Sequence, residues 1–168
     1  MTLRSNHLAS ACDPILSNVG HSETTIALAD GRSMDVCFRF PPNIEEIARV
    51  FPQAKVLAPD HCPIFTVGRC LYNPGRGDIP KWLLAHELEH TAQQGQSPDQ
   101  WWKKYLAEPT FRFDAELAAH QAEYKMLRKL ERNPDKRSAE AQAIARRLSG
   151  PLYNNMVSFS DALQMIRQ

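Results

Sequence analysis

The sequence predicts an α+β fold in a single domain, residues 1–168, with residues 1–77 mainly β and residues 78–168 helical. Ten of the twelve prolines lie before residue 110, whereas the alanine-rich and charge-rich segments follow it. The length is that of one ordinary domain, because two cores in 168 residues would each fall near the lower limit for independent folding. We therefore expect a small N-terminal β-sheet and a helical C-terminal half.

Composition and charge exclude several classes of protein. Hydrophobic residues make up 43% and charged residues 23%, which is typical of globular chains rather than disordered ones. The formal net charge of +1 gives no overall attraction to nucleic acid, so no nucleic-acid partner is expected. No apolar run reaches the roughly 18 to 20 residues that span a bilayer, and the first 20 residues lack signal-peptide features. We expect a soluble cytoplasmic protein without membrane insertion.

The cysteines predict no disulfide framework. Cys12, Cys37, Cys62 and Cys70 form no CxxC pair, and a chain of this length does not need disulfides for stability. Buried or free thiols are expected. His61 and Cys62, with Cys70, offer three ligands for a structural metal, but their spacing matches no common zinc motif.

Short apolar segments and turn residues predict the elements of the first half. Asp30-Gly31 is typical of a tight hairpin turn between two of the strands. Asn43 is expected to cap a short helix that ends near residue 51, with Glu46 completing a capping box. The predicted strands are residues 24–29, 33–40, 55–58 and 63–67.

The second half predicts a succession of helices with recognisable ends. Asp78, Ser97 and Ser158 are expected caps, Gly95 is an expected stop, and Asn133-Pro134 is expected to end the longest helix. The predicted helices are residues 79–94, 98–106, 111–132, 138–149 and a last one from about residue 158.

The first of these helices contains the sequence HELEH from His86 to His90, an HExxH pattern. Four residues advance a helix by about 400°, so the two imidazoles lie about 40° apart and can bind one metal ion. Glu87 lies about 60° farther round, close enough to act on a metal-bound water without displacing it. We predict that His86 and His90 bind Zn²⁺ and that Glu87 is the catalytic base.

A catalytic zinc usually takes three protein ligands and leaves a fourth position for water. Glu116, in the helix expected over residues 111–132, is the predicted third ligand because the alanines around it would let that helix approach closely. His120 shares its face one turn later and is either the ligand or an outer-shell partner. Asp114 and Glu123 are further alternatives.

Hydrolysis also needs a donor for the developing oxyanion. Tyr105, Arg112 and His120 have suitable chemistry, although Tyr105 also fits an ordinary core or rim position. Arg112 is expected to pair with Asp114 or Glu116, and pairing with Glu116 would hold that ligand in place.

Together these features resemble the zincins whose third ligand is a glutamate. The matching features are HELEH at residues 86–90, Trp101, Tyr105, Arg112 and the sequence ELAA from Glu116. More narrowly, residues 79–124 are similar to small metallopeptidases of bacteriophages and prophages and to the HExxH domain of contractile injection systems. The resemblance implies a zincin-like fold, Zn²⁺ held by His86, His90 and Glu116, and catalysis by Glu87.

Two functions follow as hypotheses. The first is a zinc metallopeptidase that hydrolyses peptide bonds in a peptide or protein substrate. The second is a structural component of a phage particle or injection device, incorporated in the virion, with a non-catalytic or vestigial metal site. The presence of Glu87 favours the enzyme, because a purely structural metal site needs no general base.

Overall fold

The structure is a computed structural model, and it describes residues 24–27, 33–58 and 63–168. The predicted turn at Asp30-Gly31, and also Cys12, His61 and Cys62, lie outside the described residues. Within the described part, a four-stranded sheet and six α-helices form an α+β fold, as predicted. Every described strand precedes residue 73, and the longer helices follow residue 80.

The sheet has the strand order β1-β2-β4-β3. Its strands are β1 (Thr24–Ala27), β2 (Ser33–Cys37), β3 (Phe65–Val67) and β4 (Cys70–Tyr72). The β1–β2 and β3–β4 pairs are antiparallel, whereas β2 and β4 are parallel. Met34 and Val36 alternate with less buried neighbours, which gives β2 the buried face that its sequence pattern predicts. Because β3 comes last in the strand order, it lies at an edge of the sheet.

The strand predicted over residues 55–58 is wrong. Pro52–Lys55 form a 3₁₀ helix, η1, because the fixed φ of Pro52 suits the first position of a helical turn. The sequence interpretation also missed β4, a three-residue strand whose side chains are all buried. Strands this short carry too little alternation to be recognised from the pattern alone.

The helices follow the predicted order, with shifted ends. They are α1 (Ile44–Val50), α2 (Lys81–Gln94), α3 (Pro98–Ala107), α4 (Pro109–Leu130), α5 (Pro134–Leu148), η2 (Pro151–Tyr153) and α6 (Phe159–Met165). The helix α5 begins four residues earlier than predicted. The Asn133 side chain accepts hydrogen bonds from the backbone N–H groups of Asp135 and Lys136, so this residue caps α5.

Asn133 was predicted only to end the preceding helix; of the predicted caps, only Ser158 is confirmed, because its hydroxyl accepts the N–H of Asp161. Asn43 and Ser97 make no side-chain capping hydrogen bond. Neither has the extended backbone of a normal cap, with ψ values of 17° and 56°. Pro80, rather than Asp78, occupies the capping position of α2.

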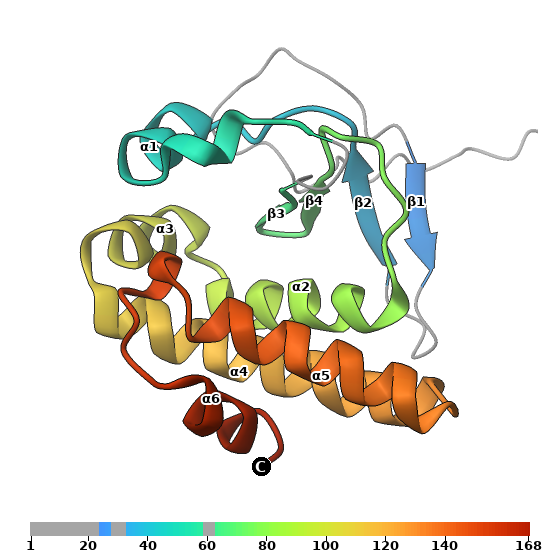
Figure 1. Cartoon of the computed structure of the whole chain (residues 1–168). Coiled ribbons are helices and arrows are strands. Elements are labelled where there is room, and N and C mark those ends of the chain that lie inside the picture. The colour runs from blue at the N-terminus through green and yellow to red at the C-terminus, as the bar shows by residue number, and fades with distance from the viewer. Residues whose placement is uncertain (1–23, 28–32, 59–62) are drawn as a thin grey trace, which may run out of the picture.

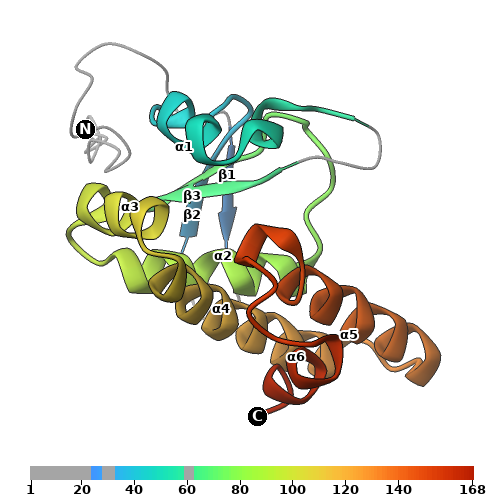
Figure 2. The same ribbon diagram turned by 60° about the vertical axis from the view of Figure 1, so that its left-hand side comes forward.

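The helix α2 lies between the sheet and the helical half, as Figures 1 and 2 show. On one side, Leu84 and Leu88 pack against the buried Met34, Val36 and Leu71 of the sheet. On the other side, α4 runs along α2, and α5 and α6 cover α4 in turn. The apolar face and the motif face of α2 therefore point to different layers.

Two tryptophans join the helical half to the sheet. Trp101 and Trp102 of α3 are both buried, and Trp102 Nε1 donates a hydrogen bond of 3.1 Å to the backbone carbonyl of Thr66 in β3. Among the described cysteines, Cys37 is a buried thiol, as expected. The prediction of a free thiol is wrong for Cys70, which is disulfide-bonded. None of the described helices combines the length and apolarity that crossing a membrane requires.

Candidate metal centre

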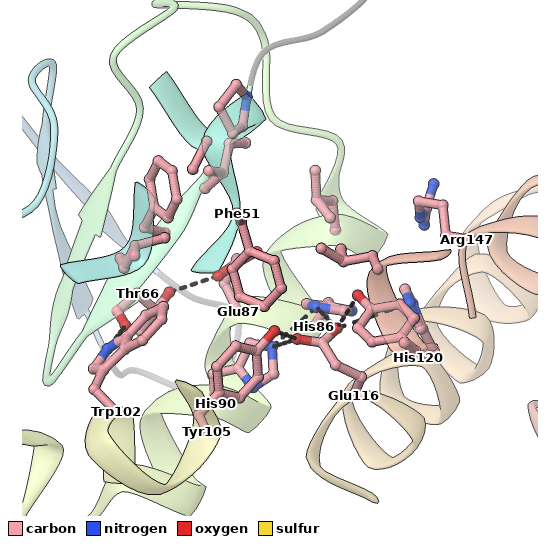
Figure 3. Close-up of a pocket in the computed structure, with 18 of the residues that line it drawn as sticks. Phe51, Thr66, His86, Glu87, His90, Trp102, Tyr105, Glu116, His120 and Arg147 are labelled. Atoms are coloured by element: carbon pink, nitrogen blue, oxygen red, sulfur yellow. Dashed lines mark hydrogen bonds and ion pairs between the residues drawn. The ribbon is translucent and has the colours of Figure 1, made fainter. Parts of the chain in front are cut away.

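The facing sides of α2 and α4 bring the predicted chemistry together. His86, Glu87 and His90 project from α2, and Glu116 meets them from α4 (Figure 3). Each of these four side chains belongs to a residue no more than 6% exposed. Burial of so many polar groups in one place is costly unless they are paired or bind a metal.

The spacing of three ligand residues suits a tetrahedral zinc. His86 Nε2 lies 3.1 Å from His90 Nε2 and 3.5 Å from Glu116 Oε2, and His90 Nε2 lies 3.4 Å from Glu116 Oε1. Bonds of about 2.0 to 2.1 Å at tetrahedral angles separate ligand atoms by about 3.3 to 3.4 Å. The geometry therefore groups Glu116 with both motif histidines.

Each motif histidine turns its other ring nitrogen to a hydrogen-bond acceptor. His90 Nδ1 lies 3.0 Å from Oε1 of Gln93, whose Nε2 donates to the carbonyl of Ala115 at 2.9 Å. His86 Nδ1 lies 3.3 Å from Glu123 Oε2 but makes no hydrogen bond with it. Acceptors at Nδ1 favour a proton there and leave Nε2 as the metal-binding nitrogen.

Glu123 is the centre of a second group of buried side chains. Its Oε2 accepts a 2.8 Å hydrogen bond from Nδ1 of His120, and its Oε1 accepts a 2.5 Å bond from Nη2 of Arg147. Burial would raise the pKa of Glu123, but the hydrogen bond from His120, the nearby His86 and the charge of Arg147 hold it well below its ordinary value. This carboxylate is therefore ionised and can orient His86.

His86, His120 and Glu123 could also be considered as metal ligands, since their ligand atoms lie within 4.8 Å of one another. However, the 2.8 Å between His120 and Glu123 is a hydrogen-bond distance and is shorter than two ligands of one zinc normally approach. We therefore interpret this group as a network that positions His86. Glu123, which the sequence left open as an alternative metal ligand, therefore contacts His86 rather than the metal.

Neutral His120 has no uncommitted proton to donate to an oxyanion. Burial and the neighbouring His86 lower its pKa to about 4, so the ring is neutral at ordinary pH. Its Nδ1 proton is used in the bond to Glu123, which leaves Nε2 as an acceptor without a partner, 3.9 Å from Glu116 Oε2. This arrangement fits the outer-shell role better than the oxyanion role.

Two tyrosine hydroxyls hold the two oxygens of Glu116. Tyr105 donates to Oε1 at 2.6 Å, and Tyr153, from η2, donates to Oε2 at 2.8 Å. Burial and the Glu116 charge raise the pKa of both phenols, so both keep their protons. Sequence reasoning included Tyr105 but missed Tyr153, which lies 37 residues beyond Glu116 in a segment without a motif.

In the metal-free site, His90 and Glu116 form a buried ion pair. Burial alone would lower the pKa of His90, but the Glu116 carboxylate raises it to about 9. Burial would raise the pKa of Glu116, but His90 and His86 hold it well below its ordinary value. A proton on His90 therefore occupies the place where a metal cation would supply positive charge.

Glu87 is held apart from the ligand group by the edge strand. Its Oε2 accepts a 2.7 Å hydrogen bond from the hydroxyl of Thr66 in β3. Gln94, at the end of α2, fixes the same strand: its Oε1 accepts the N–H of Gly68 at 2.7 Å, and its Nε2 donates to the Thr66 carbonyl at 2.8 Å. The sequence pattern did not single out Gln94, although its place one turn after His90 puts it on the motif face.

Arg112 does not make the carboxylate pair that the sequence suggested. Its Nη1 donates instead to the backbone carbonyl of Tyr105 at 2.8 Å, where α3 ends, and its guanidinium lies over the ring of Phe51. Asp114 is exposed. The buried guanidinium is thus positioned to satisfy carbonyls at a helix end and to support Tyr105.

A cavity of about 480 Å³ opens above this centre and is lined by His86, Glu87, His90, Glu116 and His120. No family model, curated protein or solved structure matched this chain in our comparisons. The functional interpretation therefore rests on the residues and their geometry. The described side chains provide a buried nitrogen and carboxylate group that could hold a metal ion, next to a space large enough for part of a ligand.

Proposed function

We propose that this protein is a zinc-dependent metallopeptidase with a zincin-like fold, and that it hydrolyses peptide bonds in a peptide or protein substrate. One observation carries the proposal: His86 Nε2 and His90 Nε2 lie 3.1 Å apart and each lies within 3.5 Å of a Glu116 oxygen, while the Glu87 carboxylate lies outside that group and lines the same cavity. A site that only bound metal would have no use for a buried carboxylate held in this position. Zinc is the proposed metal because a two-histidine, one-glutamate set is typical of it.

Different residues of the site would bind the metal and transfer the proton. His86, His90 and Glu116 would hold Zn²⁺, which when bound supplies Lewis acidity that polarises the substrate carbonyl and makes water more acidic. Glu87 takes the proton from the attacking water and returns it to the leaving amine as the C–O bond forms and the C–N bond breaks. Tyr105 and Tyr153 keep their protons and donate hydrogen bonds to the two oxygens of Glu116, which holds this ligand in place.

The experiment that tests this function separates metal binding from chemistry. Metal content is measured by elemental analysis of the parent protein and of Glu87→Gln and Glu116→Ala, with the exposed Asp114→Asn as matched control. Each protein is then incubated with an unbiased peptide library, and cleavage is read by mass spectrometry. We expect one zinc per chain in the parent, Glu87→Gln and Asp114→Asn, loss of zinc in Glu116→Ala, and cleavage only by the parent and Asp114→Asn.

Absence of zinc after reconstitution would contradict the proposal. Zinc bound without cleavage of any library member would favour the alternative, a structural component of a phage particle or injection device. A structural zinc usually closes its fourth position with a protein ligand. In the part of the chain that the structure describes, the group around His90 contains three such ligands, which favours the enzyme.

A further inference from the structure

The cavity has two chemically different ends. At one end the lining side chains are apolar and come from α1, η1, β3 and α3: they include Ile47, Phe51, Ala54, Phe65 and Trp102. At the other end lies Arg147 of α5. Figure 3 shows Phe51 and Trp102 to the left of His86 and Arg147 to its right. A ligand that filled the cavity would meet both ends and cross the metal centre between them.

Arg147 is the only lysine or arginine among the described residues that line the cavity. The two carboxyl side chains of the lining, Glu87 and Glu116, are assigned to the chemistry. The Arg147 side chain is 47% exposed, although its Nη2 is bound to Glu123. A guanidinium has five N–H donors in a planar fork, so one ion pair leaves donors for a second carboxylate.

The buried partner makes Arg147 a better binding group than an ordinary surface arginine. The side chain of Glu123 is only 2% exposed and is itself held by His120, so one end of the guanidinium is fixed in place. A cation that is already oriented loses less conformational entropy when it binds a ligand. A freely moving surface arginine would have to be ordered first.

We propose that the cavity binds peptides carrying a carboxylate, which pairs with Arg147, together with a bulky apolar side chain, which lies against Phe51 and Trp102. This inference rests on the proposed peptidase function, whose substrate class it specifies. The carboxylate is either the chain terminus of the substrate or an Asp or Glu side chain. The two sources share the same recognition chemistry and are separated by the choice of probes.

The test measures binding without turnover, so that it is independent of catalysis. The zinc-loaded Glu87→Gln protein is titrated with hexapeptides that carry one Phe and one Glu in an alanine and serine background. Each peptide is made as free acid and as C-terminal amide, and with Gln in place of Glu. We expect the recognised carboxylate form to bind at least tenfold more tightly than its neutral counterpart. Loss of preference on amidation identifies the terminus, and loss on Glu to Gln identifies the side chain.

The arginine variants, made in the Glu87→Gln background, assign this preference to one residue. Arg147→Gln should reduce it to less than twofold, and Arg147→Glu should reverse it in favour of peptides with Lys in place of Glu. Arg147→Lys retains the charge, and Arg146→Gln alters an exposed neighbour outside the cavity lining; both should keep the preference. A merely structural role of Arg147 would weaken all peptides alike without reversing their order.

The apolar end has its own matched pair in the same background. Phe51→Ala should remove the preference for Phe over Ala in the peptide, whereas Val50→Ala, at an exposed site 42% accessible, should not. A carboxylate preference below twofold, or one that survives Arg147→Gln, would overturn the inference. If the peptides bind as predicted but the parent protein cleaves none of them, the peptidase function fails and the binding specificity stands.

Discussion

The hydroxyl of Thr66 donates a 2.7 Å hydrogen bond to the Glu87 carboxylate, so the edge strand of the sheet positions the proposed base on α2. Thr66 is 2% exposed, and its backbone carbonyl is bound by Gln94 and Trp102. The strand, both flanking helices and the base therefore form one rigid unit. Catalysis depends on this type of support, because a misplaced base loses the alignment that proton transfer requires.

Replacing Thr66 by valine should lower kcat by about tenfold, which corresponds to about 1.4 kcal/mol, while one zinc per chain remains bound. Valine keeps the shape of the side chain and removes only the hydroxyl that donates to Glu87. Steady-state kinetics at saturating zinc measure the effect. Thr66→Ser retains the donor and should stay near the parent, so equal rates for the valine and serine variants would contradict the positioning role.

Glu123→Gln should weaken zinc affinity about 10- to 100-fold, because the outer partner of a ligating histidine loses its charge. The isosteric change keeps the packing around His86 and leaves Arg147 without its anionic partner. Competition with a chromophoric chelator measures the affinity. Asp114→Asn, an exposed carboxylate on the same helix, is the control and should bind zinc like the parent; an unchanged Glu123→Gln would refute the orienting network.

The part of the site that follows from helix geometry could be predicted from sequence. The positions of His86, Glu87 and His90 are set by the helical period, and the small side chains around Glu116 indicated that α4 could approach α2. These inferences depended on local periodicity, which a single sequence contains.

The remaining contacts depend on long-range packing or on local backbone choices that compete closely. Tyr153 reaches Glu116 only because α5 folds back along α4, and no periodicity connects the two residues. Asparagine is typical of both helix ends and helix caps. Asn133 is a cap here because its side chain accepts hydrogen bonds from backbone N–H groups of α5. Arg112 binds nearby carbonyls because they end α3 beside it, which the sequence does not indicate.

The metal-free protein should be most stable near pH 6.5. Burial would lower the pKa of His90, but Glu116 raises it from 6.5 to about 9, so the stability it contributes is present below pH 6.5 and lost as pH rises towards 9. Burial lowers the pKa of His120 to about 4, so the unfolded chain binds an extra proton between pH 6.5 and 4 and stability falls there. The lowered pKa values of Glu116 and Glu123 add to the acid loss.

Urea unfolding of chelator-treated protein at about pH 5, 6.5 and 9.5 measures this dependence. The His90→Gln variant should lack the decline on the alkaline side, because its side chain cannot be protonated. A free energy of unfolding that rises steadily from pH 5 to 9.5 in the parent would show that the His90 and Glu116 charge pair does not form. Excess zinc should remove the alkaline decline, since the metal takes the place of the proton.

Removing either tyrosine hydroxyl from Glu116 should loosen the third ligand. Tyr105→Phe and Tyr153→Phe each delete one hydrogen bond to a buried carboxylate, which typically contributes about 1.5 to 3 kcal/mol. We expect each variant to lower the free energy of unfolding by about that amount in the metal-free protein. Because both donors serve the same carboxylate, the effects in the double variant should not be additive.

Tyr124→Phe provides the matched control, because Tyr124 lies on α4 in the cluster between α4, α5 and α6, away from Glu116. Its unfolding free energy should stay within about 0.5 kcal/mol of the parent. If Tyr153→Phe also left the free energy of unfolding unchanged, η2 would have no role in holding Glu116. If only Tyr153→Phe lowered zinc affinity, the Oε2 atom that it binds would be the oxygen whose orientation matters most, because this atom also lies 3.5 Å from His86 Nε2.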